Sequence, residues 1–192
     1  MNRVLDLIYH LIIHPSDAMS DVTTGEKTKE SGIIWGFVIL LLALSSVEAG
    51  GFVTAFLASF VGTGSLLLIH SAVVDYISGL LGGRGTARGI TAGFMCASIP
   101  YAFSVFFSLM EQFGLDGIHR LALFVIVIWS FILDVFAIRA NYGFGKGKAF
   151  LVGISPFILC GILIVALIAI GVMTALTGIS ELQNIEGIVD SF

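Results

Sequence analysis

Five long apolar runs, separated by short polar stretches, make up most of the chain. The runs are Gly32–Val47, Phe52–Leu81, Ile90–Phe113, Leu121–Tyr142 and Ala149–Leu176. Each run is close to or above the roughly 20 residues that a helix needs to cross the hydrocarbon core of a bilayer. This pattern predicts an all-α integral membrane bundle of five transmembrane helices.

The residues before the first run have a different pattern. Polar groups recur there three or four residues apart between apolar residues, which places them on one stripe of a helix. They are Arg3, Asp6, His10 and His14. The segment Asn2–Ile13 is therefore predicted to be an amphipathic helix in the membrane interface, although packing underneath the bundle explains the pattern equally well. Pro15 suits the first turn of a second short helix, and Thr23–Ser31 is polar and turn-like.

The composition supports a membrane protein. Hydrophobic residues are 57% of the chain and charged residues 11%, whereas charged residues are about 25% of soluble domains. Too few residues lie outside the runs to bury a separate soluble core. We expect an amphipathic cytoplasmic segment at 1–31, a five-span membrane domain at 32–176 and a short extracytoplasmic tail at 177–192.

The basic residues give an orientation. Eight of the nine Lys and Arg residues fall on one side of the predicted bundle, and only Arg120 falls on the other. The eight are Arg3, Lys27, Lys29, Arg84, Arg88, Arg139, Lys146 and Lys148. Because Lys and Arg are enriched in cytoplasmic loops, we expect the N-terminus in the cytoplasm and the C-terminus outside.

Small residues and prolines mark special positions in the spans. Gly89 and Gly93 stand four residues apart in the third span, a spacing that lets two helix backbones approach closely. Pro100 in the third span and Pro156 in the fifth each remove a backbone donor. We expect both prolines to kink their helices, with neighbouring groups or water satisfying the freed carbonyl oxygens.

A few ionisable side chains lie at membrane depth, where a charge costs about 2.5 to 3.5 kcal/mol at the bilayer centre. The candidate intramembrane polar site consists of His70, Asp75, Asp134 and Arg139. We expect the two carboxylates to face the protein interior or its cytoplasmic mouth and to pair with Arg84, Arg88 or Arg139. Such ion pairs would be structural, and a functional site is the alternative. His70 is interpreted as a neutral core histidine rather than a proton carrier.

Catalytic and metal-binding signatures are absent from the sequence. Cys96 and Cys160 lack partners at metal-ligand spacing and are interpreted as small apolar packing residues. The stretch Gly143–Lys148 lacks the spacing and the closing Ser or Thr of a phosphate-binding loop, so it is interpreted as a flexible basic turn. We therefore predict no enzyme activity, no cofactor, no metal and no nucleic acid partner.

Several short motifs follow one another along the chain. They are His14-Pro15-Ser16-Asp17, Leu81-Gly82-Gly83-Arg84-Gly85-Thr86, Ser98-Ile99-Pro100-Tyr101, Trp129 followed by Asp134-Val135-Phe136-Ala137-Ile138-Arg139, and Gly147-Lys148-Ala149. In this order, and in their placement on the five spans, they resemble the Yip family of five-span membrane proteins. Eukaryotic members of that family interact with Rab-type GTPases in vesicle traffic. The resemblance covers nearly the whole chain, and its specificity comes from the order of the motifs.

The chain also departs from the family's eukaryotic pattern. Eukaryotic members generally carry a long cytosolic N-terminal region, whereas only residues 1–31 precede the first span here. This difference indicates a prokaryotic plasma-membrane member. For that branch the resemblance implies a fold and a topology but no settled biochemical activity.

Two classes of function are consistent with these features. The first is a non-enzymatic adaptor or organiser that engages anionic lipid through Asn2–Ile13 and the basic loops, or engages a cytosolic protein partner. The basic loop residues are Arg84, Arg88, Lys146 and Lys148. The second is a small transporter or lipid-handling protein in which His70, Asp75 and Asp134 line a hydrated cavity. Association into a homo-oligomer is open in both cases.

Overall fold

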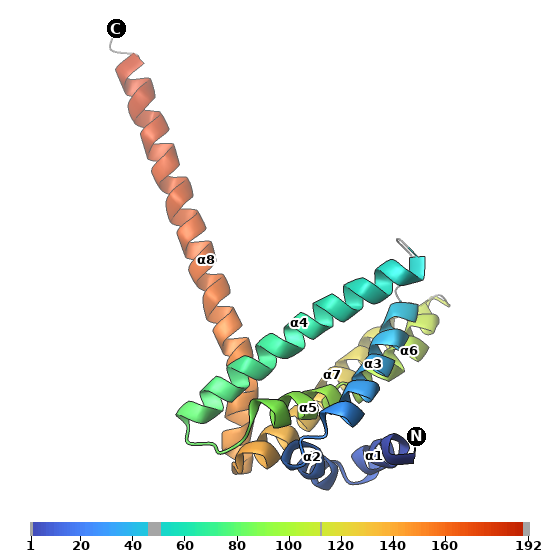
Figure 1. Cartoon of the computed structure of the whole chain (residues 1–192). Helices are drawn as coiled ribbons and strands as arrows, with labels where there is room; N and C mark the ends of the chain where they lie inside the picture. Colours follow the sequence, from blue (N-terminus) through green and yellow to red (C-terminus); the bar gives the residue numbers. More distant parts are fainter. Residues whose placement is uncertain (1, 46–50, 112, 190–192) are drawn as a thin grey trace. The chain divides into compact units, whose positions relative to one another are not determined.

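The protein is a set of helices, as the hydropathy pattern predicts. The computed structural model describes residues 2–45, 51–111 and 113–189. Figure 1 shows the elements, which are α1 (Asn2–Ile13), α2 (Pro15–Thr24), α3 (Thr28–Ser45), α4 (Gly51–Leu80), α5 (Ala87–Ala97), the 3-10 helix η2 (Ile99–Phe103), α6 (Ser104–Glu111), α7 (Asp116–Tyr142) and α8 (Lys146–Val189). Five helical segments are long and apolar enough to cross a membrane: Thr28–Ser45, Gly51–Leu80, Ala87–Met110, Asp116–Tyr142 and Lys146–Ala175. The predicted all-α class with five membrane-spanning helices is confirmed.

The chain divides into two compact units, Met1–Gly153 and Ile154–Phe192. Helix α8 begins in the first unit and continues through the second, with Pro156 inside the helix. In the second unit apolar side chains such as Ile164 and Ile168 are exposed all around the helix. A helix that is apolar on every side is typical of a membrane span. Cys160 is also exposed there, so the interpretation as a packing residue fits only Cys96.

In the first unit, α2 is part of the packed bundle. Met19, Val22 and Thr23 of this helix are almost completely buried, and α2 contacts both α5 and α7. A Cβ atom at Gly89 would lie 2.5 Å from the backbone oxygen of Thr23, and one at Gly93 would lie 2.7 Å from the Cβ of Ala137. Glycine at these positions therefore allows α5 to approach α2 and α7 closely, which is the role expected for Gly89 and Gly93.

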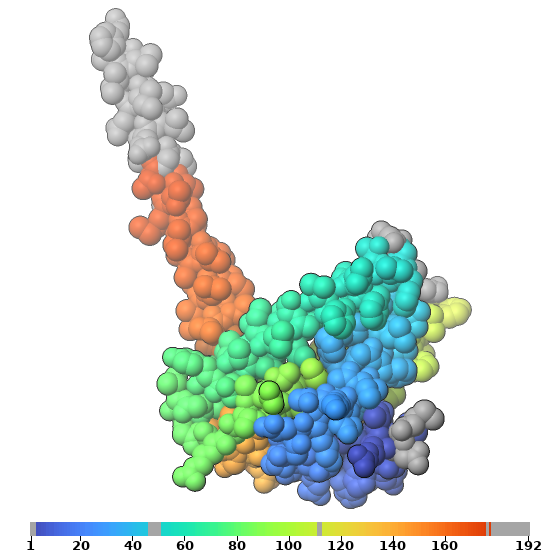
Figure 2. Space-filling view, viewed as in Figure 1, coloured from blue at the N-terminus to red at the C-terminus, as the bar shows by residue number. Residues whose placement is uncertain are grey.

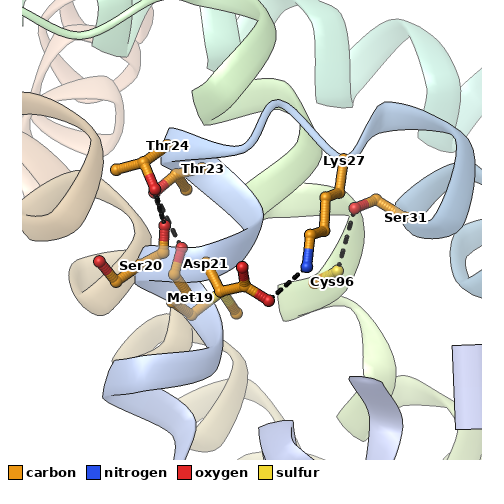
Figure 3. A network of polar contacts seen from close by, with 8 residues as sticks. All are labelled: Met19, Ser20, Asp21, Thr23, Thr24, Lys27, Ser31 and Cys96. Atoms are coloured by element: carbon orange, nitrogen blue, oxygen red, sulfur yellow. Dashed lines mark hydrogen bonds and ion pairs between the residues drawn. The ribbon is translucent and has the colours of Figure 1, made fainter. Parts of the chain in front are cut away.

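The connection from α2 to α3 is also held by side chains. Lys27 forms an ion pair with Asp21, and the Cys96 thiol donates a 3.2 Å hydrogen bond to the Ser31 hydroxyl (Figure 3). Helix α3 begins at Thr28, four residues before the apolar run, so the polar stretch expected to be a turn is largely helical. In the space-filling view α3 lies between α4 and the N-terminal helices (Figure 2).

The third span is divided at Pro100. Regular α-helix gives way there to η2, in which the backbone N–H of Tyr101 donates to the carbonyl of Ser98 at 3.0 Å. This tighter turn leaves the carbonyl of Ala97 without its usual helical donor. The hydroxyl of Ser130, on α7, donates to that carbonyl at 2.8 Å. A neighbouring helix thus satisfies the group that the change of helix type frees.

Candidate functional site at the basic end of the bundle

Two loops with basic side chains lie together at one end of the first unit. One loop joins α4 to α5 and carries Arg84, with Arg88 on the first turn of α5; the other joins α7 to α8 and leads to Lys146 and Lys148. All four basic side chains are exposed. The Lys148 ammonium group donates a hydrogen bond to the carbonyl of Leu81, so the two loops are in direct contact. We call this region the basic end.

The basic loop from α7 to α8 has a defined conformation. Helix α7 ends at Tyr142 and is capped by Gly143, whose φ of 67° is in the left-handed region, and the N–H of Phe144 donates back to the carbonyl of Arg139 at 3.2 Å. Glycine is favoured at this position because it has no Cβ atom to clash in that conformation. The ammonium group of Lys148 lies 4.4 Å from the ring centroid of Phe144, within the range of a cation–π contact. The basic turn thus has contacts among its own residues, and its flexibility stays a prediction.

Thr86, in the loop from α4 to α5, is the centre of a second set of contacts. Its backbone carbonyl accepts a 3.0 Å hydrogen bond from the Asn141 side chain, and its hydroxyl donates to Glu26 at 2.8 Å. The same hydroxyl accepts from the N–H of Gly89 at 3.0 Å and so caps the start of α5. Elements from three distant parts of the sequence therefore meet at one threonine.

Sequence reasoning missed the roles of Thr86 and Asn141. The only sequence signal for them was the glycine spacing in this region. Cβ atoms at Gly85 and Gly89 would lie 2.5 Å and 2.3 Å from atoms of the Asn141 side chain. These two glycines thus make room for an amide that hydrogen-bonds to the loop.

The intramembrane candidates have separate partners. Asp75, which is half-buried on α4, accepts a 2.7 Å hydrogen bond from the Tyr142 hydroxyl on α7. The His70 ring stacks on Phe94, with ring centroids 4.5 Å apart. Asp134 is half-buried on α7. Asp75 and His70 therefore each contact an aromatic residue on a different helix, Tyr142 on α7 and Phe94 on α5.

The expected pairing of the two carboxylates with arginine is not observed. Across residues 2–45, 51–111 and 113–189, the ion pair that the structure contains is Lys27 with Asp21. Arg84 and Arg88 extend into exposed positions at the helix ends, and Arg139 is half-buried on α7. Asp75 instead obtains its hydrogen bond from a neutral hydroxyl, which avoids burying a second charge in lipid.

A charged cleft lies between the N-terminal helices. Its volume is about 570 Å³, and side chains of both signs line it. They include Arg3, Asp6 and His10 from α1, Asp17 and Asp21 from α2, and Glu30 from α3. His70, Asp75 and Asp134 do not line this cleft. Within the described part of the chain, no cluster of three or more His, Cys, Asp or Glu side chains has metal-binding geometry.

Comparison with known protein families gives a match. The family model described as the Yip1 domain matches residues 9–168. The matched region begins in α1 and ends inside α8, so it contains both loops of the basic end and all of α2 to α7. No curated protein and no solved structure matches the chain.

Proposed function

The chain belongs to the Yip1 domain family, and from this membership and the basic end we propose that it is a non-enzymatic membrane adaptor or organiser. It is an integral membrane protein with five spanning helices. The observation that carries the proposal is the joining of two distant basic loops through Lys148 and the Leu81 carbonyl. This contact concentrates exposed basic side chains at one end of the bundle.

The ligand that suits this end is an anionic lipid headgroup. Arg84, Arg88 and Lys146 are exposed at the ends of spanning helices, the level at which phospholipid headgroups lie. Each basic residue near an anionic membrane surface contributes about 1 kcal/mol. Lys148 is partly engaged by Phe144 and Leu81, so we assign it mainly to holding the loops.

The N-terminal segment is a weaker electrostatic contact for anionic lipid. Its cleft contains the carboxylates of Asp6, Asp17 and Glu30, which repel anionic headgroups. We propose that this cleft faces the aqueous phase on the cytoplasmic side, with the C-terminus outside and the protein in a prokaryotic plasma membrane. A cytosolic protein partner or a second copy of the chain is consistent with the same arrangement.

A small transporter or lipid-handling protein is the second candidate. Asp134 favours it, because this half-buried carboxylate in a spanning helix has no Lys or Arg partner among the described residues. Asp75 and His70 are the other residues that such a function would use.

Reconstitution separates the two candidates. Purified protein is placed in liposomes that carry a fluorescent phospholipid or an entrapped fluorescent solute, and movement across the bilayer is measured. An adaptor produces the same low flux as protein-free liposomes. If the wild type shows flux and both Asp75→Asn and Asp134→Asn lose it, the adaptor proposal is wrong and the transporter function replaces it. The control variant is Asp116→Asn, at the exposed start of α7.

A further inference from the structure

Helix α1 has three distinct faces. One face packs on the bundle through Leu7 and Leu11, which are almost completely buried. A second face carries Arg3, Asp6 and His10, which line the charged cleft. The third face is apolar but exposed. It consists of Leu5, Tyr9, Ile12 and Ile13, with exposed fractions of 57%, 62%, 48% and 51%. We call these four residues the α1 stripe.

The α1 stripe is a continuous surface that points away from the bundle. Leu5, Tyr9 and Ile12 follow the i, i+4, i+7 spacing of one helix face. Leu5 and Leu7 are related by a rotation of about 200° around the helix axis. The buried face and the stripe therefore lie on opposite sides of α1. The polar face lies between them and is wetted by the cleft.

The packing of α2 fixes the position of α1 beside the spanning helices. Helix α2 follows α1 after a single residue, and its Thr23 lies against Gly89 and Gly93 of α5. Gly93 is six residues from the start of that helix, a distance of about 9 Å. Helix α1 also contacts α3. Its residues share the charged cleft with Lys27 and Glu30, so α1 lies beside the start of α3, a segment long and apolar enough to span a membrane.

From this position of α1, we expect lipid to cover the α1 stripe. At the boundary between headgroups and acyl chains, an apolar helix face enters the membrane and its polar face stays in water. The neighbouring α3, a spanning segment, also exposes apolar side chains, among them Ile33 and Phe37. Charge is consistent with this orientation, since the charged cleft is on the polar side of α1 and away from the stripe.

We propose that α1 acts as a wedge in one leaflet and makes the protein sensitive to membrane curvature. A helix about 10 Å across that is inserted in one leaflet adds area to that leaflet alone. Of the other described helices, α2 packs on α5 and α7, and the rest lie in spanning segments or extend from them. The protein is then more stable where the leaflet that holds α1 is convex. This activity goes beyond the proposed adaptor function and does not depend on the basic loops.

Sorting between flat and curved membrane tests the proposal. Fluorescent full-length protein is reconstituted in giant vesicles of neutral lipid, and narrow membrane tubes are pulled from them. Protease access to α1 selects preparations in which α1 is on the outer, convex leaflet of the tube. We expect a ratio of protein density in the tube to that in the vesicle above unity. A wild-type ratio of unity would overturn the proposal.

Two matched variants show whether the α1 stripe is responsible. The double variant Leu5→Ser with Ile12→Ser should bring the density ratio to unity without loss of thermal stability, because both side chains are exposed. The control Asp6→Ser, on the polar face of the same helix, should keep the wild-type ratio. Retention of sorting by the double variant contradicts the wedge.

A spin label at Tyr9→Cys, in a background without Cys96 and Cys160, identifies the occupant independently. We expect the label to be more accessible to oxygen, which dissolves in lipid, than to a water-soluble nickel chelate. Greater access to the chelate would place the stripe in water. Spectral broadening by a second label would place another copy of the chain on the α1 stripe. Either result would overturn the lipid wedge.

Discussion

The hydroxyl of Tyr142 donates a 2.7 Å hydrogen bond to Oδ1 of Asp75, although 67 residues separate the two in sequence. Tyr142 ends α7, and its ring stacks on Phe144 with centroids 5.7 Å apart. Phe144 in turn lies under the ammonium group of Lys148. A carboxylate within the fourth helix is thus connected to the basic loops by two aromatic rings.

Tyr142→Phe should destabilise the bundle. The change removes the donor to Asp75 and leaves a half-buried carboxylate without a hydrogen bond, which costs about 1.5 to 3 kcal/mol. The measurement is the free energy of unfolding in detergent. The control is Tyr76→Phe, at a tyrosine that is 70% exposed on the same helix as Asp75. This change should leave the free energy of unfolding unchanged. Equal stabilities of the two variants would show that the hydrogen bond contributes nothing.

Gly89→Ala should also destabilise the protein. A Cβ atom at this position would lie 2.3 Å from the Asn141 amide oxygen and 2.5 Å from the backbone oxygen of Thr23. Overpacking of this kind costs about 1 to 3 kcal/mol. Gly79→Ala is the control, because nothing lies within 4 Å of the added atom and alanine favours the helix. Thermal unfolding of both variants checks the prediction, and a tolerated alanine at position 89 would contradict the close approach.

The N-terminal segment is expected to contribute to the stability of the bundle. Met19 is completely buried on α2, so Met19→Ala should cost about 2 to 5 kcal/mol. Ser20→Ala changes the neighbouring, exposed residue and should have little effect. Unfolding free energies that do not differ between these variants would mean that α2 is not packed on α5 and α7.

The five spans could be predicted from the sequence because bilayer thickness sets the length of an apolar run. The division of the third span was signalled by Pro100, since proline lacks a backbone donor. The burial of α2 could not be predicted in the same way. Its polar residues Ser16, Asp17 and Asp21 face outward while Met19 and Val22 face inward, and a ten-residue pattern of this kind does not reveal what covers it.

The candidate site was only partly predictable, because its contacts join distant segments. The basic residues Arg84, Arg88, Lys146 and Lys148 follow from the charge pattern, but the Lys148 contact with Leu81 depends on tertiary packing. Asp75 was expected to pair with an arginine because lipid offers no compensation for a charge. Tyr142 was not considered, since an aromatic residue at the end of a span is an ordinary interface residue.

The orientation in the membrane is open to a labelling experiment. The excess of basic residues at the basic end predicts that this end is cytoplasmic. Single cysteines at Gly145, in the basic loop, and at Gly117, at the other end of α7, are introduced without Cys96 and Cys160. An impermeant thiol reagent applied to intact cells should label position 117 and not position 145. The opposite result would reverse the topology.

The proposed lipid contact is tested most directly by the affinity of the purified protein, in neutral detergent, for an anionic phospholipid. The triple variant Arg84→Gln, Arg88→Gln, Lys146→Gln should bind the lipid more weakly at low salt, because it removes three positive charges that attract the anionic headgroup. The loss should shrink at high salt, because ions screen exposed charges. Arg120→Gln, a change to an exposed charge near the other end of α7, should bind like the wild type. A triple variant with wild-type affinity, or an equal loss in Arg120→Gln, would contradict lipid recognition at the basic end.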